Sequence, residues 1–384
     1  MAKILIHHHA IAHQDKNGIK LNSFIAKWVI ELSKYFEKVG LLLHESSNVS
    51  PHQDILIDNN NIKLESLGAP GYKWDRFSRI RRIKNKCKSL SNKYDHLLIR
   101  GMTPRQITIW DNIKIKNRWF FLVQSIRYKY QPYNIKHFYL AMLERHRLRE
   151  LKKICQNSNL ISNSHESLRE AKELLSKNGY FVPTNTISKN EIPGYHFREL
   201  KNPINLLFVG RIEKQKGVSE LIGAIKILHD KNISCRLKLV GSINKDYRKE
   251  LQYEISKMEI NDLIEFHGFV KFGKRLFELY LKSDIYILPT YNEGFPHTIW
   301  EAAIHSCPIL TTNVGGIPRL LDNNKHAIIF SPRSSNEISA SITKIINKDD
   351  LRKNITSNAY KLACNYSVEN CVRILAARIK NKNV

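Results

Sequence analysis

Two glutamates separated by seven residues form the segment of the chain best suited to chemistry. They bound the sequence Glu293-Gly294-Phe295-Pro296-His297-Thr298-Ile299-Trp300-Glu301. The preceding run, residues 284–290, is largely apolar and closed by a proline, which predicts a buried strand. Pro296 suits the first turn of a helix, where the N–H group that proline lacks would have no intrahelical partner. We therefore expect Glu293 to follow the strand and Glu301 to lie inside the helix.

This placement predicts a site for an anion and for hydroxyl groups. The free amides at the start of a helix attract anions, so a diphosphate can rest near Gly294 and Phe295. The carboxylates of Glu293 and Glu301 can then accept hydrogen bonds from sugar or ribose hydroxyls. The alternative is that both glutamates are solvated or simply favour the helix dipole. The nine residues alone are equally consistent with either interpretation.

A basic strand-to-helix turn lies earlier in the same half of the chain. Arg211 and Lys216 fall between a predicted strand at 204–209 and a predicted amphipathic helix at 218–228. The planar fork of Arg211 and the point charge of Lys216 suit the two phosphates of a nucleoside diphosphate, although a solvated turn is the alternative. Neither a Gly-x-x-x-x-Gly-Lys-Ser/Thr loop nor a Gly-x-Gly-x-x-Gly fingerprint is present, which weakens the case for ATP hydrolysis and for NAD chemistry.

Glycines at further predicted strand ends point to the same site. Gly241 ends a predicted strand at 237–240, and paired glycines occur within 312–318. Glycine permits close approach of the backbone to a ligand, although a tight turn is its commoner use. The segment 266–270, which closes with Val270, is another predicted strand end whose backbone can contact a nucleobase.

The elements that must position these residues follow an alternating pattern. Short apolar runs alternate with longer amphipathic segments in both halves, which predicts an α/β fold with parallel sheets. The polar, proline-marked stretch 194–203 separates the halves. We expect two doubly wound, Rossmann-like domains, 1–198 and 199–384, that face each other across a cleft, with the final helix able to pack back on the first domain.

Charge and composition restrict the partners. The chain has 384 residues and a formal net charge of +27, so an anionic partner is expected: nucleic acid, an acidic lipid surface or phosphorylated substrates. Compositional drift is the alternative. Six scattered cysteines favour a reduced, cytoplasmic compartment, and no apolar run approaches the roughly 18 residues of a membrane span. A membrane would then be visited at its surface, on the inner face of the cytoplasmic membrane.

Two basic regions in the first half are candidates for surface binding. Residues 71–88 predict a basic amphipathic helix that can lie on an anionic membrane, or can pack its apolar stripe on its own sheet. Residues 128–139 place tyrosines among Lys and Arg and can bind lipid head groups, sugars or single-stranded nucleic acid. No zinc finger or RNA-recognition signature accompanies them, so a basic nucleic-acid-binding protein is the less favoured alternative.

The motifs taken together resemble those of the retaining, GT-B type glycosyltransferases of family 4. The resemblance rests on five motifs, which occur in this order and spacing over residues 205–346: Gly-Arg-x4-Lys-Gly, Phe-x-Gly-Phe-Val, Ser-Asp-Ile-x-Ile-Leu-Pro-Thr, Glu-Gly-Phe-Pro with a second glutamate, and Val-Gly-Gly-Ile-Pro. It implies transfer of a hexosyl unit, with retention, from a UDP- or GDP-sugar to a hydroxyl of a lipid-linked or surface-polysaccharide glycan. A nucleotide-sugar epimerase or a phosphorylase on a related scaffold is the alternative within enzymes.

The resemblance also assigns roles to residues. It implies that Arg211 and Lys216 bind the donor diphosphate and stabilise the leaving group, that Glu293 holds the transferred sugar, and that Glu301 holds the ribose. It implies no metal and no cofactor besides the donor substrate, and no nucleic-acid partner. Arg319 stands where the family commonly has a glutamate after Val-Gly-Gly-Ile-Pro, a departure that concerns the details of donor contact.

The first half offers weaker candidates. His7, His8 and His9 follow the first predicted strand, and we expect a polar strand end that borders the cleft rather than a metal site. Arg100 and Arg105 belong to a basic turn that can face an acceptor phosphate or be exposed without a role. Gln124 stands where family members often have His or Asp, so no catalytic group is assigned here.

Overall fold

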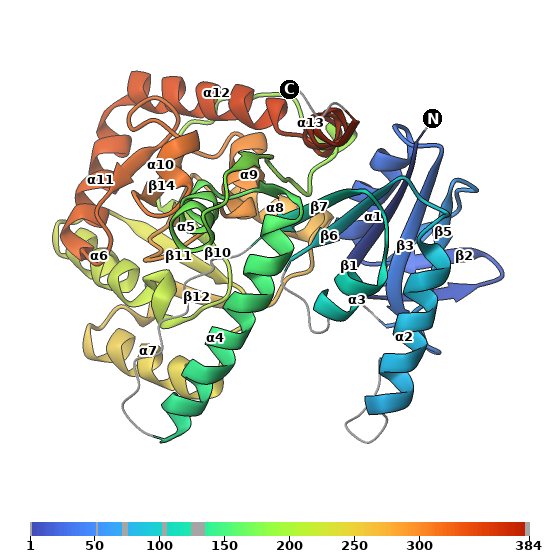
Figure 1. Ribbon diagram of the computed structural model, residues 1–384. Helices are drawn as coiled ribbons and strands as arrows, with labels where there is room; N and C mark the ends of the chain where they lie inside the picture. Colours follow the sequence, from blue (N-terminus) through green and yellow to red (C-terminus); the bar gives the residue numbers. More distant parts are fainter. Residues whose placement is uncertain (1, 51–52, 71–75, 102–105, 124–134, 381–384) are drawn as a thin grey trace. The chain divides into compact units, whose positions relative to one another are not determined.

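The computed structural model describes residues 2–50, 53–70, 76–101, 106–123 and 135–380, and the chain forms two compact units (Figure 1). The first unit comprises residues 1–186 together with 368–384, and the second comprises residues 187–367. Each unit is a mixed α/β structure built around its own sheet. The predicted fold class is confirmed at the level of each unit.

The first unit contains a nine-stranded sheet with helices packed against it. Its described elements, in chain order, are β1 Lys3–Asp15, β2 Gly18–Leu21, α1 Ser23–Ser33, β3 Lys38–Glu45, β4 Ile55–Ile57, β5 Ile62–Leu64, α2 Arg76–Leu90, β6 His96–Arg100, α3 Gln106–Asn112, β7 Asn117–Leu122, α4 Ile135–Gln156, β8 Asn159–Ser162, α5 His165–Leu175, β9 Gly179–Phe181 and α13 Val368–Lys380.

The parallel strands of this sheet run in the order β5-β3-β1-β6-β7-β8-β9. The central strand β6 is buried along its whole length because both faces of the parallel sheet are covered. The first predicted strand, which was expected to end before His7, is longer in the structure. β1 continues to Asp15 and pairs with β2 in an antiparallel hairpin, so His7, His8 and His9 lie within the strand.

The second unit contains a six-stranded parallel sheet of order β12-β11-β10-β13-β14-β15. Its described elements are η2 Lys189–Glu191, β10 Ile204–Val209, η3 Lys214–Lys216, α6 Val218–Asp230, β11 Cys235–Val240, α7 Lys245–Lys257, η4 Asn261–Leu263, β12 Ile264–Gly268, α8 Lys274–Lys282, β13 Ile285–Leu288, α9 His297–Ile304, β14 Ile309–Thr312, α10 Ile317–Leu320, β15 Ile328–Phe330, α11 Ser335–Asn347 and α12 Asp349–Asn365.

The order of these strands is that of the doubly wound dinucleotide-binding fold. The chain first moves outward from β10 to β12 and then returns to add β13 on the other side of β10. The direction of winding therefore reverses between β10 and β13. In open parallel sheets, ligands bind outside the carboxyl ends of the strands at such a switch point.

Local sequence explains the helices that follow these two strands. In α6, Val218, Leu221, Ile222 and Ile225 are buried with the helical spacing of one apolar face. α9 begins at His297, and Pro296 is its N-cap with extended backbone angles, so the proline precedes the first turn that was predicted to contain it. Its position outside the helix still costs no hydrogen bond, because the N-cap amide is not part of the helical ladder.

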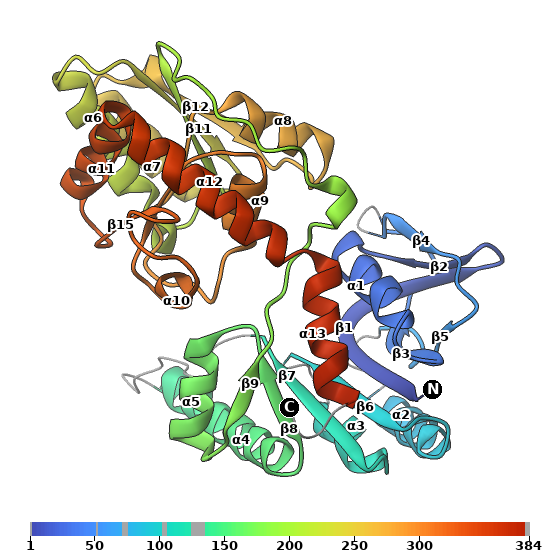
Figure 2. The same cartoon turned by 90° about the horizontal axis from the view of Figure 1, so that it is seen from above.

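The boundary between the units lies at 186/187, ahead of the 198/199 boundary drawn from the sequence. Residues 187–198, which lie between the two boundaries, belong to the second unit. The Tyr360 hydroxyl donates to the Pro193 carbonyl at 2.7 Å, and Arg198 donates to the carbonyls of Tyr280 and His305. The chain returns to the first unit in α13, which packs against α1 (Figure 2). Composition alone did not show which unit would satisfy these polar groups.

The basic helix α2 buries its apolar stripe within the first unit. Ile83, Cys87 and Leu90 belong to the core of that unit, whereas Arg81 and Arg82 are exposed. Residues 71–75 of the predicted helix lie outside the described residues. The apolar face is therefore used for folding, and only the charged face remains for a partner.

Candidate active site in the second unit

The predicted phosphate and sugar residues lie at the switch point of the second sheet. Arg211 and Lys216 follow β10, and Glu293 follows β13, which is the neighbouring strand. The carboxyl ends of parallel strands meet at one edge of a sheet, so residues 77 positions apart in the chain become neighbours. The sequence predicted both loops but not that they would touch.

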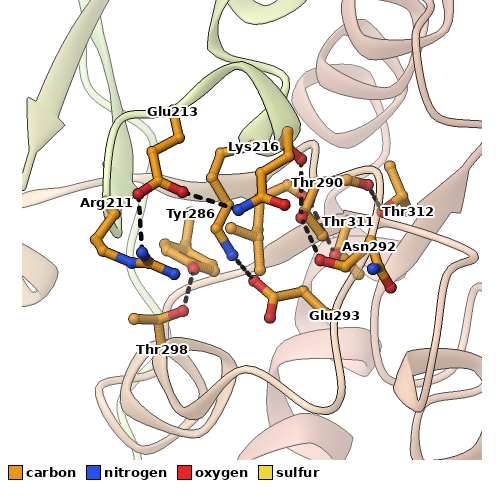
Figure 3. A network of polar contacts seen from close by, with 12 residues as sticks. Arg211, Glu213, Lys216, Tyr286, Thr290, Asn292, Glu293, Thr298, Thr311 and Thr312 are labelled. Carbon is orange, nitrogen blue, oxygen red and sulfur yellow. Dashed lines mark hydrogen bonds and ion pairs between the residues drawn. The ribbon is translucent and has the colours of Figure 1, made fainter. Parts of the chain in front are cut away.

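Lys216 and Glu293 form a direct ion pair (Figure 3). The Nζ of Lys216 donates to Oε1 of Glu293, and the two side chains are only 12% and 18% exposed. Two charges attract more strongly where water is largely excluded, and either partner left alone would be a poorly solvated charge. The pair therefore positions both groups before any ligand arrives.

Arg211 lies beside this pair but is much more accessible. Its side chain is 67% exposed, and Nη1 donates to Oε1 of Glu213 at 2.8 Å. Gln215 also donates to the Glu213 carboxylate. An exposed ion pair of this kind is weak, so the guanidinium can exchange Glu213 for an anionic ligand at small cost.

Two glycines allow the loops to approach one another. Gly217 has φ 68°, and a Cβ added there would lie 2.1 Å from the carbonyl oxygen of Pro289. Gly315 has φ 58°, and a Cβ there would lie 1.7 Å from the carbonyl oxygen of Glu293. Only glycine tolerates this left-handed backbone together with so close a contact. Gly217 and Gly315 thus allow the loops after β10, β13 and β14 to lie against each other.

Hydrogen bonds complete the connections between these loops. The amide of Tyr291 donates to the Gln215 carbonyl at 2.8 Å, and the amide of Gly316 donates to the Gly294 carbonyl at 2.7 Å. Gly294 itself is exposed, and the Phe295 ring packs against Trp300 with ring centroids 4.6 Å apart. The backbone at Gly294 and Phe295 therefore leads into the first turn of α9, where amides without intrahelical partners can bind an anion.

Glu301 lies deeper than the other site residues. It is only 5% exposed, and its Oε2 accepts a hydrogen bond from the Tyr280 hydroxyl at 2.8 Å. Burial raises the pKa of the Glu301 carboxyl to about 7, and the Tyr280 hydrogen bond opposes that effect. A carboxylate has about four acceptor positions, so the bond from Tyr280 leaves capacity for a ligand hydroxyl.

Gly241 and Val270 lie on the other side of β10. The amide of Gly241, after β11, donates to the carbonyl of Gly268 at the end of β12. Val270 is half-buried and packs on the core of the second unit, whereas the neighbouring Phe269 is 70% exposed. Both residues belong to the same carboxyl edge of the sheet as Arg211.

Sequence reasoning missed the hydroxyl groups beneath this site. The Tyr286 hydroxyl donates to Oγ1 of Thr298 at 2.6 Å, and the Thr312 hydroxyl donates to the Thr290 carbonyl at 2.7 Å (Figure 3). Tyr280 comes from α8, and no local spacing relates it to Glu301. The sequence offered one signal, which was Tyr286 inside the otherwise apolar strand β13. A buried phenol usually has a hydrogen-bond partner.

The first unit places its candidate residues differently. His7 and His8 are buried rather than part of a polar strand end, and the Nδ1 of His7 lies 2.8 Å from the Leu42 carbonyl oxygen. Burial lowers the pKa of His7 to about 4. Within the described ranges, no three His, Cys, Asp or Glu residues are grouped so that they could hold a metal ion. Arg105 and Gln124 lie outside the described residues, as do residues 128–134 of the second basic region.

None of the helices in the described part of the chain has both the length and the apolar character needed to cross a bilayer.

Comparison with known proteins shows what the second unit is similar to. Residues 195–362 match the family model of glycosyl transferases group 1. The chain is 27% identical over 187 residues to the capsular polysaccharide biosynthesis glycosyltransferase CapM of Staphylococcus aureus, a match that covers 48% of each chain. It spans about half the length of the curated relatives it matches.

Solved structures share the whole fold at low identity. HepE of Anabaena, crystallised with UDP and glucose, matches with a TM-score of 0.71 at 16% identity, over 99% of this chain and 100% of that one. WaaG, a glycosyltransferase involved in lipopolysaccharide biosynthesis, matches with a TM-score of 0.66 at 14% identity, over 98% and 100% of the two chains. Residues 195–362 are therefore similar to glycosyl transferases group 1, within a chain that has the GT-B fold of two Rossmann-like domains.

Proposed function

We propose that the protein is a glycosyltransferase that moves a hexosyl unit from a nucleoside diphosphate sugar to a hydroxyl of a glycan acceptor. The observation that carries the proposal is the sheltered Lys216–Glu293 pair at the switch point between β10 and β13. In such a donor the diphosphate is bonded directly to the sugar. Lys216, which suits the phosphate, and Glu293, which suits the sugar hydroxyls, must therefore lie side by side. UDP is the first candidate nucleotide, because HepE was crystallised with it.

In this proposal each residue acts on one part of the donor. Arg211 exchanges Glu213 for the diphosphate, and Lys216 neutralises charge that develops as the bond between the sugar C1 and the diphosphate oxygen breaks. Glu293 accepts hydrogen bonds from the sugar hydroxyls and holds C1 in position. Glu301, with its free acceptor positions, holds the ribose hydroxyls, while backbone groups at Gly241 and Val270 line the nucleoside side.

We further propose that the transfer retains the configuration at C1. The acceptor oxygen would attack from the face that the diphosphate leaves, and the departing diphosphate oxygen would take the acceptor proton. Positioning and electrostatics then supply most of the rate enhancement. Arg211 and Lys216 are catalytic in this scheme because they stabilise the leaving group. The support is the resemblance of the motifs to those of retaining enzymes.

The acceptor is proposed from the relatives and from charge. CapM acts in capsular polysaccharide biosynthesis, and WaaG in lipopolysaccharide biosynthesis. A lipid-linked or surface-polysaccharide glycan is the corresponding acceptor here. The exposed Arg81, Arg82 and Lys84 of α2 would hold the protein electrostatically at the anionic inner face of the cytoplasmic membrane.

Calorimetric titration tests the donor assignment. We expect UDP or GDP to bind tightly and oligonucleotides to bind only in a salt-sensitive manner, as for a basic surface. Incubation of the matching nucleotide sugar with a glycan acceptor should release nucleoside diphosphate in step with product. Tight oligonucleotide binding without nucleotide binding would favour a nucleic-acid-binding protein. Conversion of the donor sugar without an acceptor would favour an epimerase, and a requirement for inorganic phosphate would favour a phosphorylase.

A further inference from the structure

In the described part of the first unit, one buried arginine has guanidinium nitrogens without a hydrogen-bond partner. Arg100, at the end of β6, is 4% exposed rather than part of an exposed turn. Within the described part of the chain, its Nε and Nη1 are enclosed and have no hydrogen-bond partner. Burial lowers the pKa of Arg100 to about 10. Burying an unpaired charge is costly, so its retention calls for an explanation.

Aromatic rings enclose the guanidinium group. Its Cζ lies 4.4 Å from the ring centroid of Phe24, 5.4 Å from that of Trp28 and 5.4 Å from that of Phe121. Ring faces attract a cation and orient its plane. They do not replace the oxygen acceptors that the N–H groups require, so the rings hold the fork in place without satisfying it.

The surroundings of Arg100 favour a negative charge. Phe24 belongs to the first turn of α1, which contains no acidic residue, so the positive end of that helix dipole lies beside the guanidinium. His8 lies next to Arg100 on the adjacent strand β1, because the register of β1 with β6 places His7 opposite Ile99. Burial, together with the charge of Arg100, lowers the pKa of His8 to about 2.

The neutral His8 ring adds a second hydrogen-bond donor. Its Nδ1 accepts a hydrogen bond from the amide of Ala10 at 2.9 Å, so the proton of the neutral ring is on Nε2. Among the described residues, Nε and Nη1 of Arg100 are the nitrogens of the fork left without an acceptor. A carboxylate or phosphate at either of them would supply that acceptor, and the planar fork allows a second bond from Nη2 to the same group.

We propose that Arg100, with the first turn of α1 and His8, binds an acidic group of the acceptor, which is therefore a sugar that bears a carboxylate or a phosphate. The role of this ligand as acceptor rests on the proposed function, whereas the binding of an anionic sugar does not.

The test begins with the unmodified full chain. Calorimetric titration with glucuronate, glucose 6-phosphate and glucose should show at least tenfold tighter binding of one or both anionic sugars than of glucose. Binding should weaken as salt is raised. The two anionic probes distinguish a carboxylate ligand from a phosphate ligand. Anionic sugars bound no better than glucose would overturn the proposal.

Substitution then assigns the binding to Arg100. Arg100→Met should weaken binding of the anionic sugar at least tenfold and should leave the melting temperature equal or higher, because a buried unpaired charge is removed. Arg169→Met, which removes an exposed arginine from the same unit, should bind as the parent does. If Arg100→Met does not fold, Arg100→Lys keeps the charge without the fork and should show an intermediate loss. Parental binding by the soluble Arg100 variant would overturn the proposal.

Titration with UDP in the same samples separates this inference from the proposed function. UDP should bind the parent and Arg100→Met equally. A loss of UDP affinity in Arg100→Met would place the guanidinium on the donor and overturn the acceptor assignment. Binding of anionic sugars by a parent that does not bind UDP would leave the Arg100 site standing and refute the donor site.

Discussion

At the scale of single residues, we expect nucleotide affinity to depend on Lys216 and not on the nearby Lys214. Lys216 is sheltered and paired with Glu293, whereas Lys214, two residues earlier, is 73% exposed and pairs with Glu250 on α7. Lys216→Ala should weaken nucleoside diphosphate binding by about 1.5–3 kcal/mol, the range of hydrogen bonds to charged groups. Arg211→Ala should have a smaller effect in the same direction.

The control for this prediction is Lys214→Ala, which removes the same charge from the same turn and should leave the affinity within about twofold, because an exposed pair contributes little. Titration calorimetry with UDP and GDP gives the affinities, and thermal melting verifies the fold. Equal affinities in the Lys214, Lys216 and Arg211 variants would remove the phosphate assignment.

The two glutamates should differ in what their substitution changes. Glu293→Gln should reduce the rate of sugar transfer much more than the affinity for bare nucleoside diphosphate, since it acts on a sugar that this ligand lacks. Glu301→Gln should weaken both, because the ribose is present in both ligands. Nucleotide titrations beside initial rates with the full donor make the comparison. Transfer at the parental rate by Glu293→Gln would show that the roles are assigned wrongly.

At the scale of elements, the approach of the loops sets the geometry of the site. Gly217→Ala would place a methyl group against the backbone of Pro289 in a left-handed conformation, so we expect a loss of stability of about 1–3 kcal/mol and weaker nucleotide binding. Gly194→Ala is the matched control, because a Cβ there meets nothing within 4 Å. Melting temperature and UDP affinity are the measurements. If the Gly217 variant were as stable as the Gly194 variant and bound UDP as tightly, this account would be contradicted.

The helix α2 carries a second prediction at this scale. Replacing Arg81, Arg82 and Lys84 with Gln should reduce binding to anionic vesicles and leave the fold unchanged, because these exposed side chains are not part of the core. Each charge near an anionic surface contributes about 1 kcal/mol. The triple variant Lys245, Lys249 and Lys257→Gln on α7 removes the same charge elsewhere and should bind as the parent does. Co-sedimentation with anionic and neutral vesicles measures the difference; equal partition onto both would refute membrane docking.

At the scale of the whole molecule, the buried Glu301 links stability to pH. Its pKa is raised by burial from 4.5 to about 7, so the protonated form is the one that the fold favours. The stability this provides is fully present below about pH 4.5 and is lost as pH rises through about 7. Relative to Glu301→Gln, which keeps an acceptor for Tyr280 without titrating, the parent should lose on the order of 3 kcal/mol across this window.

Melting temperatures of the two proteins from pH 4.5 to 8.5 measure this loss, and parallel curves would show that Glu301 does not titrate as stated. Nucleotide binding should reduce the slope if a ribose hydroxyl donates to the ionised carboxylate, because that bond favours the charged form.

Much of the architecture followed from local sequence. The strands β10 and β13 were predicted within two residues of where they occur, because short apolar runs bounded by glycine, proline or polar residues have few other structures available. Arg211, Lys216 and Glu293 were identified for the same reason: they follow such runs directly, and their side chains have the chemistry of phosphate and hydroxyl recognition.

The tertiary structure decided which of these residues meet and which are hidden. Lys216 touches Glu293 only because β13 is added beside β10, a pairing that joins residues 77 positions apart. Likewise, Arg100 was expected in a basic turn, either facing an acceptor phosphate or exposed without a role. It lies among the rings of Phe24, Trp28 and Phe121, which come from α1 and β7. Local sequence determines whether a segment is a strand or a helix, because propensity and periodicity act over a few residues. Burial and pairing depend on contacts distant in the chain, which only the packed structure provides.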